Sequence, residues 1–101
     1  MNNYRKLNEL FNQADKLYIY LNCDTIGKEF MKNAEDEGFR FADGKKPTKR
    51  KHADIMAVYK NKELCYVGYI GRINFKRDDC DVPRIDYDKY ITYQNNYFYK
   101  E

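Results

Sequence analysis

Two short stretches of this chain are apolar at almost every position, and they limit its fold more than any other feature. Residues 17–21 read LYIYL and residues 54–59 read DIMAVY. Side chains alternate between the two faces of a strand, so a segment without a polar face belongs to a strand that is covered on both sides. A short polar segment at 60–63 and further apolar residues follow the second stretch, which predicts a β-hairpin.

Helical spacing occurs in two places. Apolar residues recur every three or four positions over residues 2–15, and they do so again in a segment that Asp24 or Thr25 can cap and Gly38 can end. Residues 39–41 alternate between apolar and charged, which predicts a short strand before a turn.

The segment from Leu64 to Phe75 alternates and predicts one long strand, with a core face and a second face that turns polar. Residues 68–71 within it match the Gly-x-x-Gly motif of KH domains. In KH domains that motif is a loop between two helices, whereas here it lies in a predicted strand. Residues 84–87 predict an edge strand. These elements favour one α+β domain over residues 1–101: two layers, with a mixed or antiparallel sheet of about four to five strands and two helices packed on one face.

The net charge of +3 hides a strong asymmetry along the 101 residues. Residues 1–44 carry six Lys and Arg against eight Asp and Glu, residues 45–77 carry ten against two, and residues 78–101 carry three against six. A strongly basic middle third therefore lies between two acidic flanks. Such asymmetry bears on partners more than on fold, and it predicts an anionic partner.

Residue content excludes several kinds of catalytic site. The chain has no Ser and a single His, so neither a Ser-His pair nor a two-His metal site can be built in one protomer. Asp54 and Glu63 are the only carboxylates flanking the hairpin that a metal-dependent nuclease could use. We therefore expect a binding protein without cofactor or metal. No export signal or membrane span is recognisable, which predicts a cytoplasmic protein with reduced cysteines.

Positive charge is densest in residues 45–52, which we call the basic loop. We expect an anion site built from this loop and from residues of the following hairpin. In it, the planar guanidinium of Arg72 binds a phosphate, and a base stacks on the ring of Tyr66. The candidate residues are Lys45, Lys46, Lys49, Arg50, Lys51, His52, Tyr66, Arg72, Lys76 and Arg77. Two alternatives stay open: the loop only solubilises the protein, or Arg72 pairs with Asp86 or Asp88 on the next strand.

Several stretches resemble small, functionally unassigned proteins from phages and mobile elements of Gram-positive bacteria. They are residues 17–21, 34–41, 43–48 and 66–71, within a similarity over about residues 17–91. The resemblance implies no catalytic residues. It implies an anti-defence factor in the host cytoplasm, and so a host defence protein is a possible partner.

Two functions follow from these observations. The first is non-catalytic binding of a nucleotide or dinucleotide, which in so short a chain predicts a homo-oligomer with sites near protomer boundaries. The second is an interaction or inhibitor protein that binds nucleic acid or a nucleic-acid-binding host effector. Five aromatic residues over 90–99 predict that the tail at 92–101 is a contact between copies.

Overall fold

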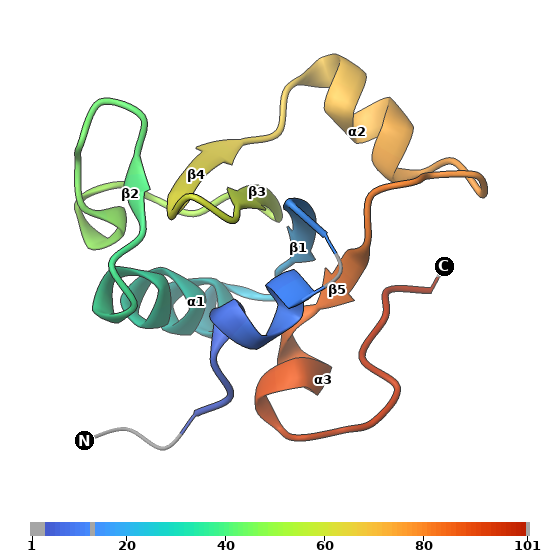
Figure 1. Ribbon diagram of the computed structural model, residues 1–101, viewed down its shortest axis with the longest axis horizontal. Helices are drawn as coiled ribbons and strands as arrows, with labels where there is room; N and C mark the ends of the chain where they lie inside the picture. Colours follow the sequence, from blue (N-terminus) through green and yellow to red (C-terminus); the bar gives the residue numbers. More distant parts are fainter. Residues whose placement is uncertain (1–3, 13, 101) are drawn as a thin grey trace.

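The computed structural model describes residues 4–12 and 14–100, which form one five-stranded mixed sheet with helices on both sides (Figure 1). The strands lie in the order β2-β4-β3-β1-β5. Their bounds are β1 Lys16–Tyr20, β2 Arg40–Phe41, β3 Ile55–Tyr59, β4 Glu63–Tyr66 and β5 Arg84–Asp86. The helices are α1 Asp24–Asp36, α2 Tyr69–Phe75 and α3 Tyr87–Ile91, with 3-10 turns η1 Leu7–Asn12 and η2 Pro47–Lys49. The predicted α+β class and mixed sheet are confirmed.

The pairing of the strands follows from the two apolar stretches. β3 and β4 form the predicted antiparallel hairpin, with Val58 opposite Leu64. On its other side, β3 pairs with β1 in antiparallel register. β1 in turn pairs with the edge strand β5 in parallel register. β2 closes the opposite edge by a parallel pairing with β4. The two all-apolar segments therefore lie in the middle of the sheet, where each has a neighbour on both sides.

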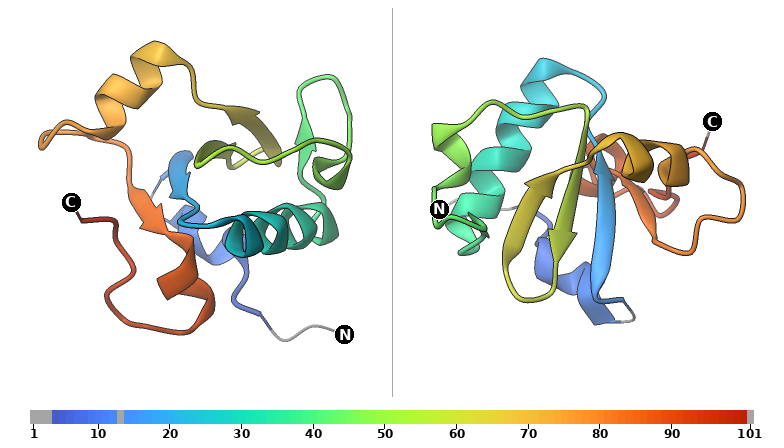
Figure 2. Two further views of the ribbon diagram at one scale, coloured as in Figure 1. Left: turned by 180° about the vertical axis from the view of Figure 1, so that it is seen from behind. Right: turned by 90° about the horizontal axis from the view of Figure 1, so that it is seen from above.

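The core has two parts, one on each face of the sheet. On one face, Leu17 and Ile19 of β1 pack with Phe30 of α1 and with buried residues of η1 and α3. On the other face, Tyr18 of β1 packs edge-on against Phe75 of α2, with ring centroids 5.8 Å apart. Figure 2 shows the sheet between these layers. η1 and α1 lie on the first face, at the positions of the two predicted helices, and α2, which was not predicted, covers the second face.

The first predicted helix is much shorter than its apolar spacing suggests. Residues 2, 3 and 13 lie outside the described part of the chain, and within it only Leu7–Asn12 are helical, as a 3-10 turn. Side chains before this turn are held by distant partners: the Tyr4 hydroxyl donates to the carbonyl of Asn33, and the Arg5 guanidinium lies over the Tyr90 ring. These tertiary contacts replace the first turn of the expected helix.

The long strand predicted from Leu64 to Phe75 is wrong. β4 ends at Tyr66, Gly68 is extended at the N-cap position, and Tyr69 begins α2. Val67, Gly71 and Phe75 are buried or partly buried and lie four residues apart. This spacing is compatible with a helix as well as with a strand. Gly71 permits a close approach, because a Cβ there would lie 2.7 Å from a methyl of Val67.

The tail packs on its own domain. Residues 87–91 form α3, with Tyr87 and Tyr90 buried, and the chain then returns along β5. There the Asp86 amide donates to the Tyr97 carbonyl at 2.7 Å, and the Tyr99 amide donates to the Arg84 carbonyl at 2.9 Å. Tyr90, Tyr97 and Tyr99 are therefore covered wholly or in part by the same chain, whereas Tyr93 and Phe98 stay 60 and 50 % exposed.

Among the residues that the structure describes, no helix combines the length and the apolar character needed to cross a membrane.

Candidate anion-binding site

A cavity of about 660 Å³ lies between α1 and the basic loop. Figures 1 and 2 show α1 and η2 side by side at the edge of the molecule next to β2. The cavity is lined by Asp24, Lys28, Met31, Thr48, Lys49, Arg50, Lys51 and His52. Four of these side chains are permanent cations and one is a carboxylate, so the cavity has a positive character.

The basic loop is fixed in place at several points. Pro47 is buried and begins η2, and the Thr48 hydroxyl and amide both donate to Glu35 of α1, at 2.5 and 3.2 Å. The hydroxyl hydrogen bond is the main reason why the pKa of Glu35 is lowered. Farther along, the Tyr66 hydroxyl donates to the carbonyl of Lys51 at 2.6 Å. The backbone of the basic loop is therefore held to α1 and to β4.

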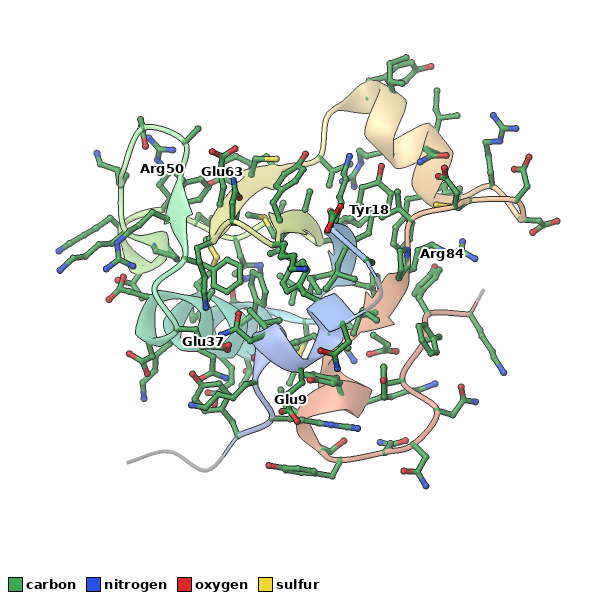
Figure 3. All side chains as sticks on the ribbon, viewed as in Figure 1. Glu9, Tyr18, Glu37, Arg50, Glu63 and Arg84 are labelled. Carbon is green, nitrogen blue, oxygen red and sulfur yellow. The ribbon has the colours of Figure 1, made fainter. Side chains whose placement is uncertain are left out.

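Arg50 is anchored at the turn that precedes η2. The side chain of Arg50 is labelled in Figure 3; its guanidinium pairs with Asp43 and lies over the ring of Phe41, 4.5 Å from the centroid. The Lys45 amide and the Arg50 side chain, in that order, lower the pKa of Asp43. Arg50 is therefore paired with a carboxylate that lies just before the basic loop.

His52 forms the wall of the cavity at the start of α1. Its ring covers Gly27, where a Cβ would overlap the ring atoms. Nε2 lies 3.0 Å from Asp24 Oδ1, and Nδ1 lies 3.1 Å from the carbonyl of Ala53. Asp24 thus serves as a partner of His52 and Lys28 instead of capping the helix, and these two hydrogen bonds lower its pKa. The N-cap residue is Cys23, which makes no side-chain cap.

Of the cations that line the cavity, Lys49 and Lys51 are the best placed to meet a ligand. Among residues 4–12 and 14–100, neither side chain makes an ion pair, whereas Lys28 is paired with Asp24. Both line the cavity and are exposed to solvent. An anion entering here would replace water around two unpaired ammonium groups without breaking an existing ion pair.

The ten residues predicted for the site do not come together in one place. Lys45 and Lys46 belong to the same loop but do not line the cavity. Lys76 and Arg77 lie at the end of α2, across the molecule from the loop (Figure 1), and Arg77 pairs with Asp79 at 2.9 Å. The prediction of a single surface from loop and hairpin is therefore wrong, because the hairpin strand ends early and turns away into α2.

Arg72 and Tyr66 have structural partners. Arg72 projects from α2 and pairs with both carboxylate oxygens of Asp54 at 2.8 Å, so its partner is neither of the two carboxylates considered from the sequence. The Tyr66 ring lies 5.5 Å from that of Phe41, and its hydroxyl holds the loop backbone. With 46 % of its side chain exposed, Tyr66 positions Lys51 from outside the cavity.

The carboxylate pair considered for a nuclease is not assembled. Asp54 precedes β3 and binds Arg72, whereas Glu63 begins β4 opposite Tyr59, at the other end of the antiparallel hairpin. In the described part of the chain, no group of three or more His, Cys, Asp or Glu side chains could hold a metal ion.

No family model, curated protein or solved structure matches this chain. The resemblance to small phage proteins therefore stays a prediction.

The residues that sequence reasoning missed belong to α1. Asp24, Gly27 and Lys28 lie 17 to 21 positions before the start of the basic loop, and no local pattern connects the two segments. The one available signal was the place of α1 directly after an apolar strand, because the start of such a helix favours anions.

Proposed function

We propose that this protein binds a small phosphate-bearing ligand, of the nucleotide or dinucleotide class, in the cavity between α1 and the basic loop, without changing it chemically. The observation that carries the proposal is the pair of unpaired ammonium groups, Lys49 and Lys51, on a loop that is fixed to α1 and to β4. A loop whose backbone is already held in place loses less conformational entropy when its lysines bind an anion.

The size of the cavity supports a small ligand. About 660 Å³ falls within the roughly 300–1,000 Å³ of pockets that enclose small molecules. Met31 contributes an apolar side chain to the lining, and Lys28, Lys49, Arg50 and Lys51 contribute basic ones. Such a combination suits a molecule with an apolar ring at one end and a phosphate at the other.

The cation arrangement favours this function over nucleic-acid binding. A duplex needs a continuous basic surface, because affinity for its backbone depends on several phosphates being neutralised at once. Here the basic loop and the cations of α2 lie apart, and Arg72 and Arg77 are paired with carboxylates. A role as a phage anti-defence protein that sequesters a nucleotide signal rests on the resemblance alone and is part of the same proposal.

Calorimetric titration with a panel of mononucleotides, cyclic dinucleotides and inorganic pyrophosphate tests the proposal. The double variant Lys49→Ala/Lys51→Ala should bind at least about tenfold more weakly, since each lost charged contact is worth on the order of 1 kcal/mol. The matched control is Lys45→Ala/Lys60→Ala, which removes the same charge from exposed positions outside the cavity. It should change the affinity less than about threefold.

Three results would count against a pocketed nucleotide. One is no heat with any ligand of the panel. Another is an equal loss of affinity in both double variants, which would indicate attraction by net charge only. A third is tight binding to duplex or single-stranded oligonucleotides that falls steeply between low and physiological salt, which would favour the nucleic-acid function instead.

A further inference from the structure

The helix α2 carries apolar side chains on two sides, and only one side is covered. Phe75 and Gly71 face the sheet, whereas Tyr69, Ile70 and Ile73 are 79, 75 and 46 % exposed. A helix that is apolar on both sides ordinarily packs between two partners. Figure 1 shows α2 at the periphery of the molecule, with the sheet on one side and no other element on the other.

We propose that the outer face of α2 is the contact between two copies of this chain. We call it the α2 face: Tyr69, Ile70, Ile73, Lys76 and Arg77, the last two following directly on the helix. At helical spacing Tyr69, Ile70 and Ile73 fall on one side, opposite the side that packs on the sheet, and Lys76 and Arg77 follow at the end of the helix. The proposal does not depend on the anion site.

When two α2 faces meet in antiparallel orientation, each residue lies opposite a residue with which it makes a favourable contact. In a two-fold contact the helix meets its copy in antiparallel orientation, so Ile73 at the axis meets Ile73 of the copy. Tyr69 then lies opposite Arg77, and Ile70 lies opposite Lys76. A guanidinium over a tyrosine ring and a lysine stem along an isoleucine are both favourable contacts.

The charges beside the α2 face favour a copy over other partners. Lys76 and Arg77 are followed by Asp78, Asp79 and Asp81, so the border carries both signs. An anionic membrane or nucleic acid would be repelled by Asp78 and Asp81, which make no ion pair among the described residues, whereas in the two-fold contact these carboxylates lie beyond the paired segments 69–77. The apolar side chains also have no counterpart on a phosphate backbone.

The size of the α2 face sets the strength of the contact. Its three apolar side chains expose on the order of 400 Å², within the range of the largest patches on monomers, which are often functional. This is about half of what each partner contributes to a standard interface. We therefore expect a reversible dimer that dissociates on dilution.

Sedimentation velocity of the full chain over a wide concentration range tests this. The wild type should shift from monomer to dimer, and Ile73→Glu should weaken association at least about tenfold. Tyr93→Glu is the matched control, because it introduces the same negative charge in place of another exposed large side chain, in the tail. It should leave the dimer unchanged, and circular dichroism should show that both variants are folded.

Cross-linking tests the register. In a Cys23→Ser background, Ile73→Cys should form a disulfide-linked dimer on mild oxidation, because only residues whose Cα atoms come within about 7 Å can be bridged. Tyr93→Cys should cross-link far less. The proposal is overturned if the wild type stays monomeric up to about 1 mM, if Tyr93→Glu dissociates the dimer while Ile73→Glu does not, or if the protein stays monomeric and sediments with anionic vesicles.

Discussion

Replacing Gly27 by Ala tests the contact on which the wall of the cavity depends. Gly27 is buried in α1 under the His52 ring, and a Cβ there would overlap the ring atoms. Two effects of opposite sign compete. Alanine in place of glycine inside a helix stabilises by about 1 kcal/mol, whereas inserting an atom into a packed site costs about 1–3 kcal/mol.

The structure decides which effect prevails, because the ring cannot easily move aside. His52 is held on both nitrogens, by Asp24 and by the carbonyl of Ala53, and only 12 % of its side chain is exposed. We therefore expect Gly27→Ala to lower the free energy of unfolding by up to about 2 kcal/mol. In a His52→Ala background the overlap is gone, and the same change should stabilise by about 1 kcal/mol.

Urea denaturation of the wild type, the two single variants and the double variant measures this coupling, which should lie between about 1 and 3 kcal/mol. If Gly27→Ala is equally stabilising in both backgrounds, the His52 ring does not lie on Gly27 and the described wall of the cavity is wrong. The same variant keeps every charge of the site. A loss of ligand affinity in Gly27→Ala would therefore report on the shape of the cavity alone.

Three further predictions concern the core and the tail. Tyr87→Phe removes the hydroxyl that accepts from the buried Asn33 amide at 2.9 Å, and urea denaturation should show a loss of about 1–3 kcal/mol; a neutral result would contradict the hydrogen bond. Burial raises the pKa values of Tyr87 and Tyr90 above 10.0, so the unfolded chain releases these protons first as pH rises. Unfolding monitored against pH should show that this contribution to stability is fully present below about pH 10 and is lost above it, whereas a flat profile to pH 12 would contradict the burial. Arg5→Ala removes a guanidinium that lies 4.6 and 4.8 Å from the centroids of the Tyr90 and Tyr97 rings, and thermal unfolding should detect a loss of about 1 kcal/mol that Tyr93→Ala, at the rim, does not match.

The middle of the fold was predictable because its signals are local and agree with one another. The apolar stretches at 17–21 and 54–59 became β1 and β3, and α1 ends before Gly38, which adopts the left-handed conformation expected of it. The segment at 64–75 was predicted as a strand because residues four positions apart share one face of a strand as well as one face of a helix. Val67 and Phe75 therefore satisfy strand alternation and helical spacing together, and only packing on Tyr18 selects the helix.

Of the candidate site, only the basic loop was predictable from the sequence. Charge density identified the basic loop, since five cations occur within residues 45–51. Nothing in the sequence indicated that His52 would lie on Gly27, or that Arg72 would be neutralised by Asp54. These are contacts between segments about twenty residues apart, and periodicity or composition contains no information about such pairs.

The antiparallel pairing of residues 97–99 with β5 has a consequence for how the protein behaves at high concentration. A bare sheet edge offers a row of unpaired amides and carbonyls on which a foreign strand can grow. Here the hydrogen bonds from Asp86 and Tyr99 occupy that row, and the opposite edge, β2, is only two residues long. Cutting the chain before Tyr97 would uncover one such template, so the shortened protein should form fibrous aggregates where the intact one stays dispersed.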